Sequence, residues 1–187
     1  MTARTNAPYV LALIGIVFAP SARAQTSGFE VSTGYLVARA SDQTLPLGWS
    51  LEVSRDFGPT WSIVGEVGGA YKTTAAKSLG VDVDLRIHTV GIGARWSTRS
   101  SHRIVPFAQM VAGAARLGAS AKIRGVTTGD SSTDLMLMPA GGLKVRLAHP
   151  FAVVGHIDYR RVFIDRADNN GSAAHQLSAF IGINVSP

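Results

Sequence analysis

Three residues that could take part in acid–base chemistry alternate along one segment: His156, Asp158 and Arg160. In an extended chain, residues two apart point to the same side, so these side chains would share one face of a strand. A hydrolytic site needs a nucleophile with a base within reach, and none accompanies this group. Its mid-strand position would also give a substrate poor access. We therefore expect an ion cluster there and no catalytic centre.

The other histidines offer no better site. His175 and Ser178 are three residues apart, so on one strand they would point to opposite faces. His88, His102 and His149 are isolated from one another and do not have the spacing of a metal cluster. The sequence also lacks a G-x-S-x-G elbow, an H-E-x-x-H helix motif and a phosphate-binding G-x-x-x-x-G-K-[ST] loop. We predict no catalytic residue, no metal site, no cofactor and no enzyme activity.

The composition restricts which elements could position these side chains. The 187 residues are 46% hydrophobic and 16% charged, with 20 glycines and no cysteine, against ~25% charged in an average soluble domain. The chain is too apolar to be disordered, and it cannot form a disulfide framework or a thiolate metal site. Its length suits one domain.

The N-terminal residues have the pattern of a secretory signal peptide. Arg4 precedes a short apolar run over residues 10–19, and residues 22–24 form an A-x-A cleavage site. A membrane anchor is the alternative, but a spanning helix needs ~20 apolar residues. We predict a cleaved signal peptide over 1–24 and a single domain over 25–187. Export argues against nucleic-acid binding despite the pI of 10.2, as does the scatter of the basic residues.

Apolar residues in the mature chain recur at every second position and not at helical spacing. Leu47, Trp49 and Leu51, for example, alternate with Gly48 and Ser50. This alternation predicts two-faced strands. We expect eight of them, over residues 28–39, 46–57, 60–72, 84–98, 103–118, 133–147, 151–164 and 174–185. Single-chain bacterial outer-membrane barrels have such an even number of strands.

The predicted connections alternate in length. Short turns alternate with longer polar loops, as in outer-membrane barrels whose periplasmic turns are short. The sequence therefore predicts an eight-stranded antiparallel up-and-down transmembrane β-barrel, with both termini in the periplasm. The tight turns are 56–60, 99–102 and 148–150, the long loops are 73–83, 119–132 and 165–173, and the first loop, 40–45, is modest.

Two predicted strands are ambiguous. In the fourth, apolar residues up to Ile87 have odd numbers, and those from Val90 onward have even numbers. A β-bulge near His88 and Thr89 would explain this switch, and so would a hairpin that extends above the membrane. In the fifth strand, over 103–118, both faces are largely apolar, so its inward face is not assigned.

Alternation alone does not distinguish a membrane barrel from a soluble, lipocalin-like barrel with an apolar interior. The polar face here is rich in glycine, alanine and serine, which suit the crowded interior of a narrow barrel. The apolar face carries aromatic residues near strand ends, such as Trp49, Trp61, Trp96 and Tyr159, which resemble the aromatic belts of membrane proteins. Together with the export signal, these features favour the membrane barrel.

Several charged residues then fall on the inward side of the strands. Ions in a confined interior are costly unless paired, so we predict a structural ion-pair network, with the basic excess, such as Arg146, near an open end in water. An interior filled by side chains would act as a plug, and the alternative is a gated polar path. A diffusion pore is not expected, because open aqueous channels need about 16–18 strands. The predicted network consists of Glu52, Glu66, Arg86, Arg95, Lys144, Arg146, His156, Asp158 and Arg160.

Three segments resemble the outer-membrane β-barrel domain family, in particular the small OmpA/OmpX-like barrels and the opacity-type surface proteins. They are residues 87–117, 140–163 and 175–185, with Pro106-Phe107, Gly141-Gly142 and Asp158-Tyr159 among the positions that carry the resemblance. It implies a location in the outer membrane of a Gram-negative bacterium and insertion by the barrel-assembly machinery. It carries no catalytic residues. The chain departs from the family in ending Val185-Ser186-Pro187, where such barrels usually end in an aromatic residue.

We expect a monomeric protein in contact with outer-membrane lipid, with a role in membrane integrity, adhesion or recognition of an extracellular ligand. The long loops would supply the contact surface, through Lys122 and Arg124 in one and Asp165, Arg166 and Asp168 in another. Two alternatives remain: a periplasmic lipocalin-like barrel that binds an apolar ligand, and a lipid-modifying barrel enzyme that uses a histidine such as His175.

Overall fold

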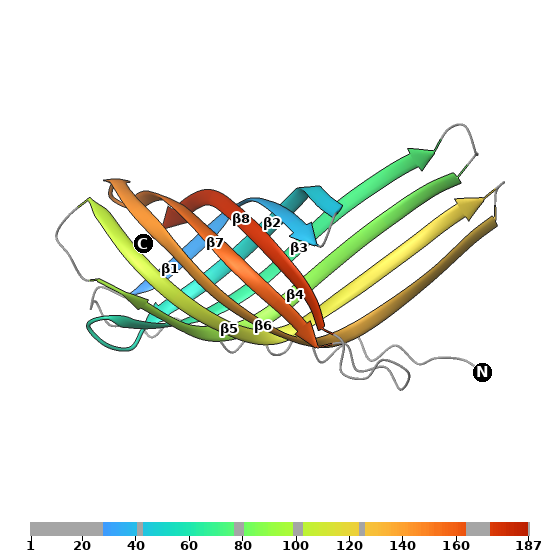
Figure 1. The fold of residues 1–187 in the computed structure, drawn as a ribbon. Helices are drawn as coiled ribbons and strands as arrows, with labels where there is room; N and C mark the ends of the chain where they lie inside the picture. Colours follow the sequence, from blue (N-terminus) through green and yellow to red (C-terminus); the bar gives the residue numbers. More distant parts are fainter. Residues whose placement is uncertain are drawn as a thin grey trace, which may run out of the picture.

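A computed structural model describes residues 28–40, 43–76, 81–98, 103–123, 126–163 and 173–186. The predicted signal peptide lies outside these ranges. Each strand pairs antiparallel with the next, and β1 pairs with β8 to close the barrel (Figure 1). The predicted up-and-down barrel is thus confirmed. Its strands are β1 Phe29–Ala40, β2 Gln43–Asp56, β3 Trp61–Ala76, β4 Val81–Ser97, β5 Ile104–Ile123, β6 Val126–Ala148, β7 Phe151–Phe163 and β8 Ala173–Val185. Among the described residues, no helix is both long and apolar enough to span a membrane.

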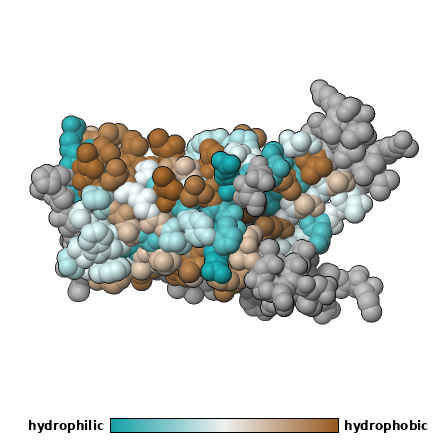
Figure 2. All heavy atoms as spheres, in the orientation of Figure 1, coloured by the Kyte–Doolittle hydropathy of each residue, from teal (hydrophilic) through white to brown (hydrophobic). Residues whose placement is uncertain are grey.

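The alternation seen in the sequence sorts the side chains to the two sides of the sheet. In β7, Val154, His156 and Asp158 are buried, whereas Ile157 and Tyr159 are exposed. The other strands follow the same rule, so large apolar side chains cover much of the outer surface (Figure 2). A soluble lipocalin-like barrel would have the reverse arrangement, with an apolar interior and a polar exterior.

The seam between β1 and β8 depends on two glycines at opposing positions. Gly34 pairs with Gly182, and a Cβ atom at Gly34 would lie 2.2 Å from the carbonyl oxygen of Ile181. A Cβ atom at Gly182 would lie 2.4 Å from the carbonyl oxygen of Thr33. Only glycine permits this approach of the two backbones.

Four strands project beyond the rim of the barrel. The hairpins β3–β4 and β5–β6 both reach past their neighbours on the right of Figure 1. On β3, residues 72–76 lie beyond Tyr71, the last residue paired with β2, and on β6 residues 126–134 lie before Leu135, the last paired with β7. We call this projecting four-stranded sheet the extension, its end of the barrel the extended end, and the opposite end the turn end.

The extension corrects the predicted strand boundaries. The loops expected over 73–83 and 119–132 are largely strand, because β3 and β4 pair as far as Ala76 and Val81, and β5 and β6 as far as Ile123 and Val126. Serine and threonine are frequent in 126–134, so the segment reads as a loop although it suits a strand outside the membrane. Arg124 lies outside the described residues, as do Asp165, Arg166 and Asp168 of the loop predicted over 165–173.

A bulge near His88 and Thr89, one of the two explanations for the parity switch, is absent from β4. The pairing of β4 with β3 and with β5 is continuous through this region. The apolar parity changes toward the extended end of β4: Ile92 faces outward, whereas Ile87, the last inward residue before the extension, and Leu85, within it, lie on the inner side. Of the two explanations, the projecting hairpin is therefore the observed one.

The inward face of β5 is now defined. Phe107, Gln109 and Val111 point inward, and Ile104 and Met110 point outward. Irregular pairing occurs instead in β1, between residues 36 and 38, and in β6, between residues 146 and 148.

Candidate functional site

A buried polar cluster fills the middle of the barrel, and one half of it is centred on Glu52. Arg95 of β4 donates from Nη2 to Glu52 Oε2 of β2 at 2.5 Å, and both side chains are less than a tenth exposed. Gln109 of β5 donates from Nε2 to Glu52 Oε1 at 3.1 Å and accepts from Arg95 Nε at 2.8 Å. The Arg95 guanidinium also stacks 4.5 Å from the centre of the Phe107 ring. These contacts hold both oxygens of one carboxylate.

The other half is centred on Arg160 of β7. Its Nε lies 3.0 Å from Asp158 Oδ1 and its Nη2 lies 3.5 Å from Glu66 Oε1. Ser50 Oγ donates to the same Glu66 oxygen at 3.4 Å, and the Met138 sulfur accepts from Arg160 Nε at 3.1 Å. Arg160 is among the largest fully buried side chains of the described chain.

His156 lies between these two halves. Its Nδ1 is 4.0 Å from Glu52 Oε1 and its Nε2 is 3.8 Å from Asp158 Oδ2, both beyond hydrogen-bond length. The ring stacks on Phe180 with centroids 4.7 Å apart and meets the edge of Phe107 at 6.1 Å. Aromatic packing, rather than hydrogen bonding to a described residue, therefore fixes the imidazole.

The register explains why two arginines are needed. Glu52 and Glu66 occupy directly opposite positions on β2 and β3 and point into the same interior. Like charges at opposite positions repel, and each buried ion costs several kcal/mol unless it is paired. Arg95 approaches one carboxylate and Arg160 the other, from different strands. With Asp158, the centre contains three carboxylates and two guanidiniums.

A second, less buried ion pair lies toward the turn end. Lys144 Nζ donates to Glu30 Oε1 at 2.5 Å, and both side chains are less than a fifth exposed. Asn184 donates to Glu30 Oε2 at 3.3 Å and to Ser32 Oγ at 2.9 Å. Arg146 is exposed nearby, where it lines a small hollow with Glu30 and Lys144.

Buried apolar side chains form two groups around the polar cluster. A buried group packs together toward the extended end and around His156; it consists of Leu36, Ala38, Leu45, Ala70, Ile87, Phe107, Val154 and Phe180. A smaller group comprises Ala115, Met136 and Val162. Both apolar groups lie on the inner side of the wall, alongside the polar cluster.

One residue assigned to the interior by sequence is not there. Arg86 lies on the outer side of β4, and its side chain is 62% exposed, 3.9 Å from Asp84. Arg86 and Arg95 are nine positions apart and could share a face only across a bulge. Because β4 has none, the two arginines point to opposite sides.

Two interior partners were missed by the sequence reasoning. Gln109 was overlooked because the faces of its strand were unassigned, although it has the same parity as Val105 and Phe107. Glu30 lies close to the start of β1, where only a few residues establish the alternation. Glu30 and Leu36 are both even-numbered, so counting back along the strand from the buried Leu36 would have assigned Glu30 to the inner face.

The structure does not bring the described Ser178 and His175 together as nucleophile and base. Ser178 is buried in the interior, whereas His175 is exposed and stacks on the outward-facing Tyr159, with the phenol and imidazole hydrogen-bonded. Over the described ranges, no three histidine or acidic residues are placed to hold a metal ion.

A closed antiparallel barrel with an apolar exterior and a buried ionic interior is the architecture of integral outer-membrane proteins. The sequence matches the family described as outer membrane protein beta-barrel domain over residues 9–184. The chain belongs to this family, as its resemblance suggested. No curated protein matches the sequence.

Solved structures show the same fold. Ail, the attachment invasion locus protein of Yersinia pestis, superposes with a TM-score of 0.60 at 16% identity, covering 86% of this chain and 99% of Ail. Neisserial surface protein A superposes with a TM-score of 0.64 at 13% identity, covering 86% and 98%. A major outer membrane protein of Thermus thermophilus gives 0.61 at 10% identity, covering 84% and 98%. At these identities the similarity concerns the fold alone.

Proposed function

We propose that this chain is a non-catalytic, monomeric surface protein whose barrel is a sealed anchor and whose extension makes contacts outside the cell. The observation that carries the proposal is the contrast between the two parts. The barrel interior holds paired ions and buried apolar side chains, whereas the extension presents polar strands beyond the rim.

The ion pairs and aromatic packing of the interior support an anchoring role over transport. Arg95 and Arg160 cross the interior to reach carboxylates on other strands, and Phe107 and Phe180 pack on His156 between them. Eight strands leave room for side chains but not for a wide aqueous channel. In this proposal the ion network is structural and acts as a plug.

The extension supports the contact role. Its outermost described hairpin joins β5 and β6, and residues 128–131 are exposed on it. Connecting segments that project from a rigid scaffold commonly carry binding functions. The proposal places the extended end outside the cell and the turn end in the periplasm, after removal of a signal peptide over 1–24 and insertion by the barrel-assembly machinery into the outer membrane of a Gram-negative bacterium.

A trimmed variant separates the two roles. Gly118 and Ser131 are paired in the register of β5 and β6, so residues 119–130 can be replaced by Asn-Gly, which forms a tight two-residue hairpin turn. The barrel strands below the cut keep their pairing. Full-length and trimmed chains are then displayed on a non-adherent laboratory strain, with heat-modifiable gel mobility as the check that both have folded.

Two measurements test the proposal. Liposomes that contain the purified protein should swell in arabinose no faster than protein-free liposomes. Cells displaying the full chain should adhere to heparin-coated surfaces or epithelial monolayers, and cells displaying the trimmed chain should not. Heparin is a suitable probe because Ail was solved with the heparin analogue sucrose octasulfate. Rapid swelling would refute the sealed anchor. Equal adhesion of the two strains, or no adhesion by either strain, would refute the contact role.

A further inference from the structure

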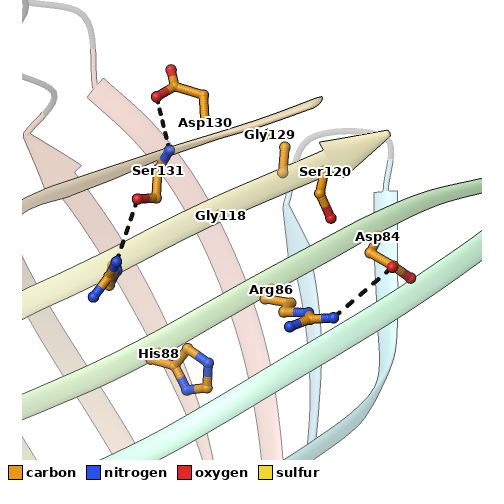
Figure 3. Close-up of a pocket in the computed structure, with 10 residues that line it drawn as sticks. Asp84, Arg86, His88, Gly118, Ser120, Gly129, Asp130 and Ser131 are labelled. Atoms are coloured by element: carbon orange, nitrogen blue, oxygen red, sulfur yellow. Dashed lines mark hydrogen bonds and ion pairs between the residues drawn. The ribbon is translucent and has the colours of Figure 1, made fainter. Parts of the chain in front are cut away.

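A hollow lies on the outer face of the barrel wall where β4, β5 and β6 leave the rim. Its volume is about 540 Å³, and Gly118 and Gly129 leave its floor without side chains (Figure 3). Arg86, His88 and Arg116 stand at its side nearer the barrel. The remaining lining residues are Asp84, Ala119, Ser120, Asp130 and Ser131.

The two arginines are held near each other by the strand register. His88 of β4 is opposite Arg116 of β5, and Arg86 is opposite Gly118, two residues farther along. Arg86 and Arg116 are therefore diagonal neighbours on one face, a relation that places backbones roughly 7–8 Å apart and within reach for long side chains. Their guanidiniums flank the hollow floored by Gly118.

Both guanidiniums retain free hydrogen-bonding capacity. Arg86 Nη2 lies 3.9 Å from Asp84 Oδ2, which is beyond hydrogen-bond length, and both side chains are at least a third exposed. Arg116 donates from Nη2 to Ser131 Oγ at 3.5 Å (Figure 3), and among the described residues it has no carboxylate within ion-pair distance. An arginine has five N–H donors in a planar fork that suits phosphate oxygens.

The hollow lies beside an aromatic group on the same outward face. Trp49 Nε1 donates to the Tyr71 hydroxyl at 3.4 Å, and the Tyr71 ring meets the edge of His88 with centroids 5.4 Å apart. Tyr71 is also the register partner of Arg86. Outward-facing tryptophan and tyrosine mark the depth of lipid headgroups in membrane proteins. Arg86 and Arg116 therefore face sideways at headgroup depth and not into the aqueous space above.

We propose that this hollow binds the phosphate group of a membrane lipid, with Arg86 and Arg116 as the anion ligands and His88 as a further N–H donor. Guanidinium forks bind phosphate oxygens in bidentate fashion, and basic pockets between the transmembrane helices of other membrane proteins bind phosphorylated lipid headgroups. The site goes beyond the proposed surface role, because it faces lipid and does not require the outermost hairpin to contact another cell.

The test uses the full chain in nanodiscs of phosphatidylcholine with a minor share of phosphatidic acid, whose headgroup is a phosphate monoester. Native mass spectrometry counts the phosphatidic acid retained per protein. Arg86→Gln/Arg116→Gln should reduce retention about tenfold, the scale of lost charge-assisted hydrogen bonds. The matched control is Arg39→Gln/Arg161→Gln, which removes two exposed arginines from β1 and β7 and should change retention less than about twofold.

A variant that preserves every charge tests the shape of the hollow. The nearest atom that a Cβ at Gly118 would meet is the carbonyl oxygen of Arg86 at 3.9 Å, so Gly118→Leu should fill the floor without disturbing the strand. It should reduce retention as the double variant does. Full retention by Gly118→Leu, or equal losses in the Arg86/Arg116 and Arg39/Arg161 variants, would show diffuse charge attraction and overturn the proposal.

Competition identifies the source of the phosphate. Inorganic phosphate and sucrose octasulfate are added separately to the loaded nanodiscs. Retention that is unaffected by either supports a lipid headgroup, whose acyl chains lie against the barrel. Displacement by inorganic phosphate would indicate a site for free phosphate, and displacement by sucrose octasulfate a site for soluble polyanions; either result would overturn the lipid assignment. Adhesion of the displaying cells is a separate readout, so failure of the surface role remains distinguishable.

Discussion

Replacing Arg95 with methionine tests whether the interior cluster holds the barrel together. Methionine keeps much of the side-chain volume but removes the donor that lies 2.5 Å from Glu52 Oε2. The Glu52 carboxylate, 1% exposed, would then retain the Gln109 amide and have His156 at 4.0 Å. The charge of Glu52 would be left inside the barrel without a guanidinium.

The expected loss of unfolding free energy follows from these contacts. Removing one partner of a buried ion pair costs about 3–5 kcal/mol, because the remaining ion stays desolvated. The stacking of the guanidinium on Phe107, 4.5 Å from the ring centre, contributes about 0.5–2 kcal/mol more. We therefore expect Arg95→Met to destabilise the barrel by about 5 kcal/mol. Replacing both charges, in Arg95→Met/Glu52→Met, should recover most of that loss, since apolar substitutes for a buried pair are often neutral.

Urea titration in lipid vesicles measures the effect. The three tryptophans report unfolding by fluorescence, and gel mobility without boiling reports the folded fraction. Arg39→Met is the control because Arg39 is exposed on β1, and it should change the unfolding free energy by less than about 0.5 kcal/mol. A loss below about 1 kcal/mol for Arg95→Met, or a double variant less stable than the single one, would refute the reasoning.

Three further perturbations have defined outcomes by the same urea titration. Ile157→Arg, in the lipid-facing row of β7, should cost about 2–4 kcal/mol, whereas Ile104→Arg at the end of β5 should cost about 0–1 kcal/mol; equal costs would contradict the assigned membrane depth. Gly34→Val should destabilise the β1–β8 seam by about 1–3 kcal/mol or more, and Gly65→Ala, with its nearest contact at 3.9 Å, should be nearly silent. Asn184→Leu should cost about 1–3 kcal/mol, because the buried β1 groups that accept its amide hydrogens lose their donor; no change would mean that water replaces the amide.

Much of the barrel was predictable because lipid and interior impose opposite demands on successive residues. Alternation in β7 assigned His156, Asp158 and Arg160 to the interior, and all three are buried there. The alternation ends where the strands leave the barrel, because there neither face is required to be apolar. Beyond the rim both faces of β5 and β6 can be polar, so strands in 119–132 have no periodic signal and read as a loop.

The interior network shows a second limit. Sequence parity predicts which side chains point inward but not which of them meet, because the stagger of the strands decides that. Arg160 approaches Glu66, 94 positions away, and Arg95 approaches Glu52, 43 positions away. The sequence pattern also assigned Arg86 to the wrong face. Its assignment required a bulge in β4, and without that bulge every residue on this end of the strand points to the opposite side.

The alternation of side chains along each strand also bears on how such a chain reaches its membrane. The longest strand, β6, has 23 residues, yet Asp130, Asp134, Lys144 and Arg146 interrupt it. If β6 formed a helix, these four charged residues would lie on its surface. Its uninterrupted apolar run is also shorter than the ~20 residues that a spanning helix needs. As a single helix, β6 would therefore not be apolar enough to span a membrane. The lipid-compatible surface exists only after neighbouring strands pair and separate the two sets of side chains, which makes it a property of the assembled sheet.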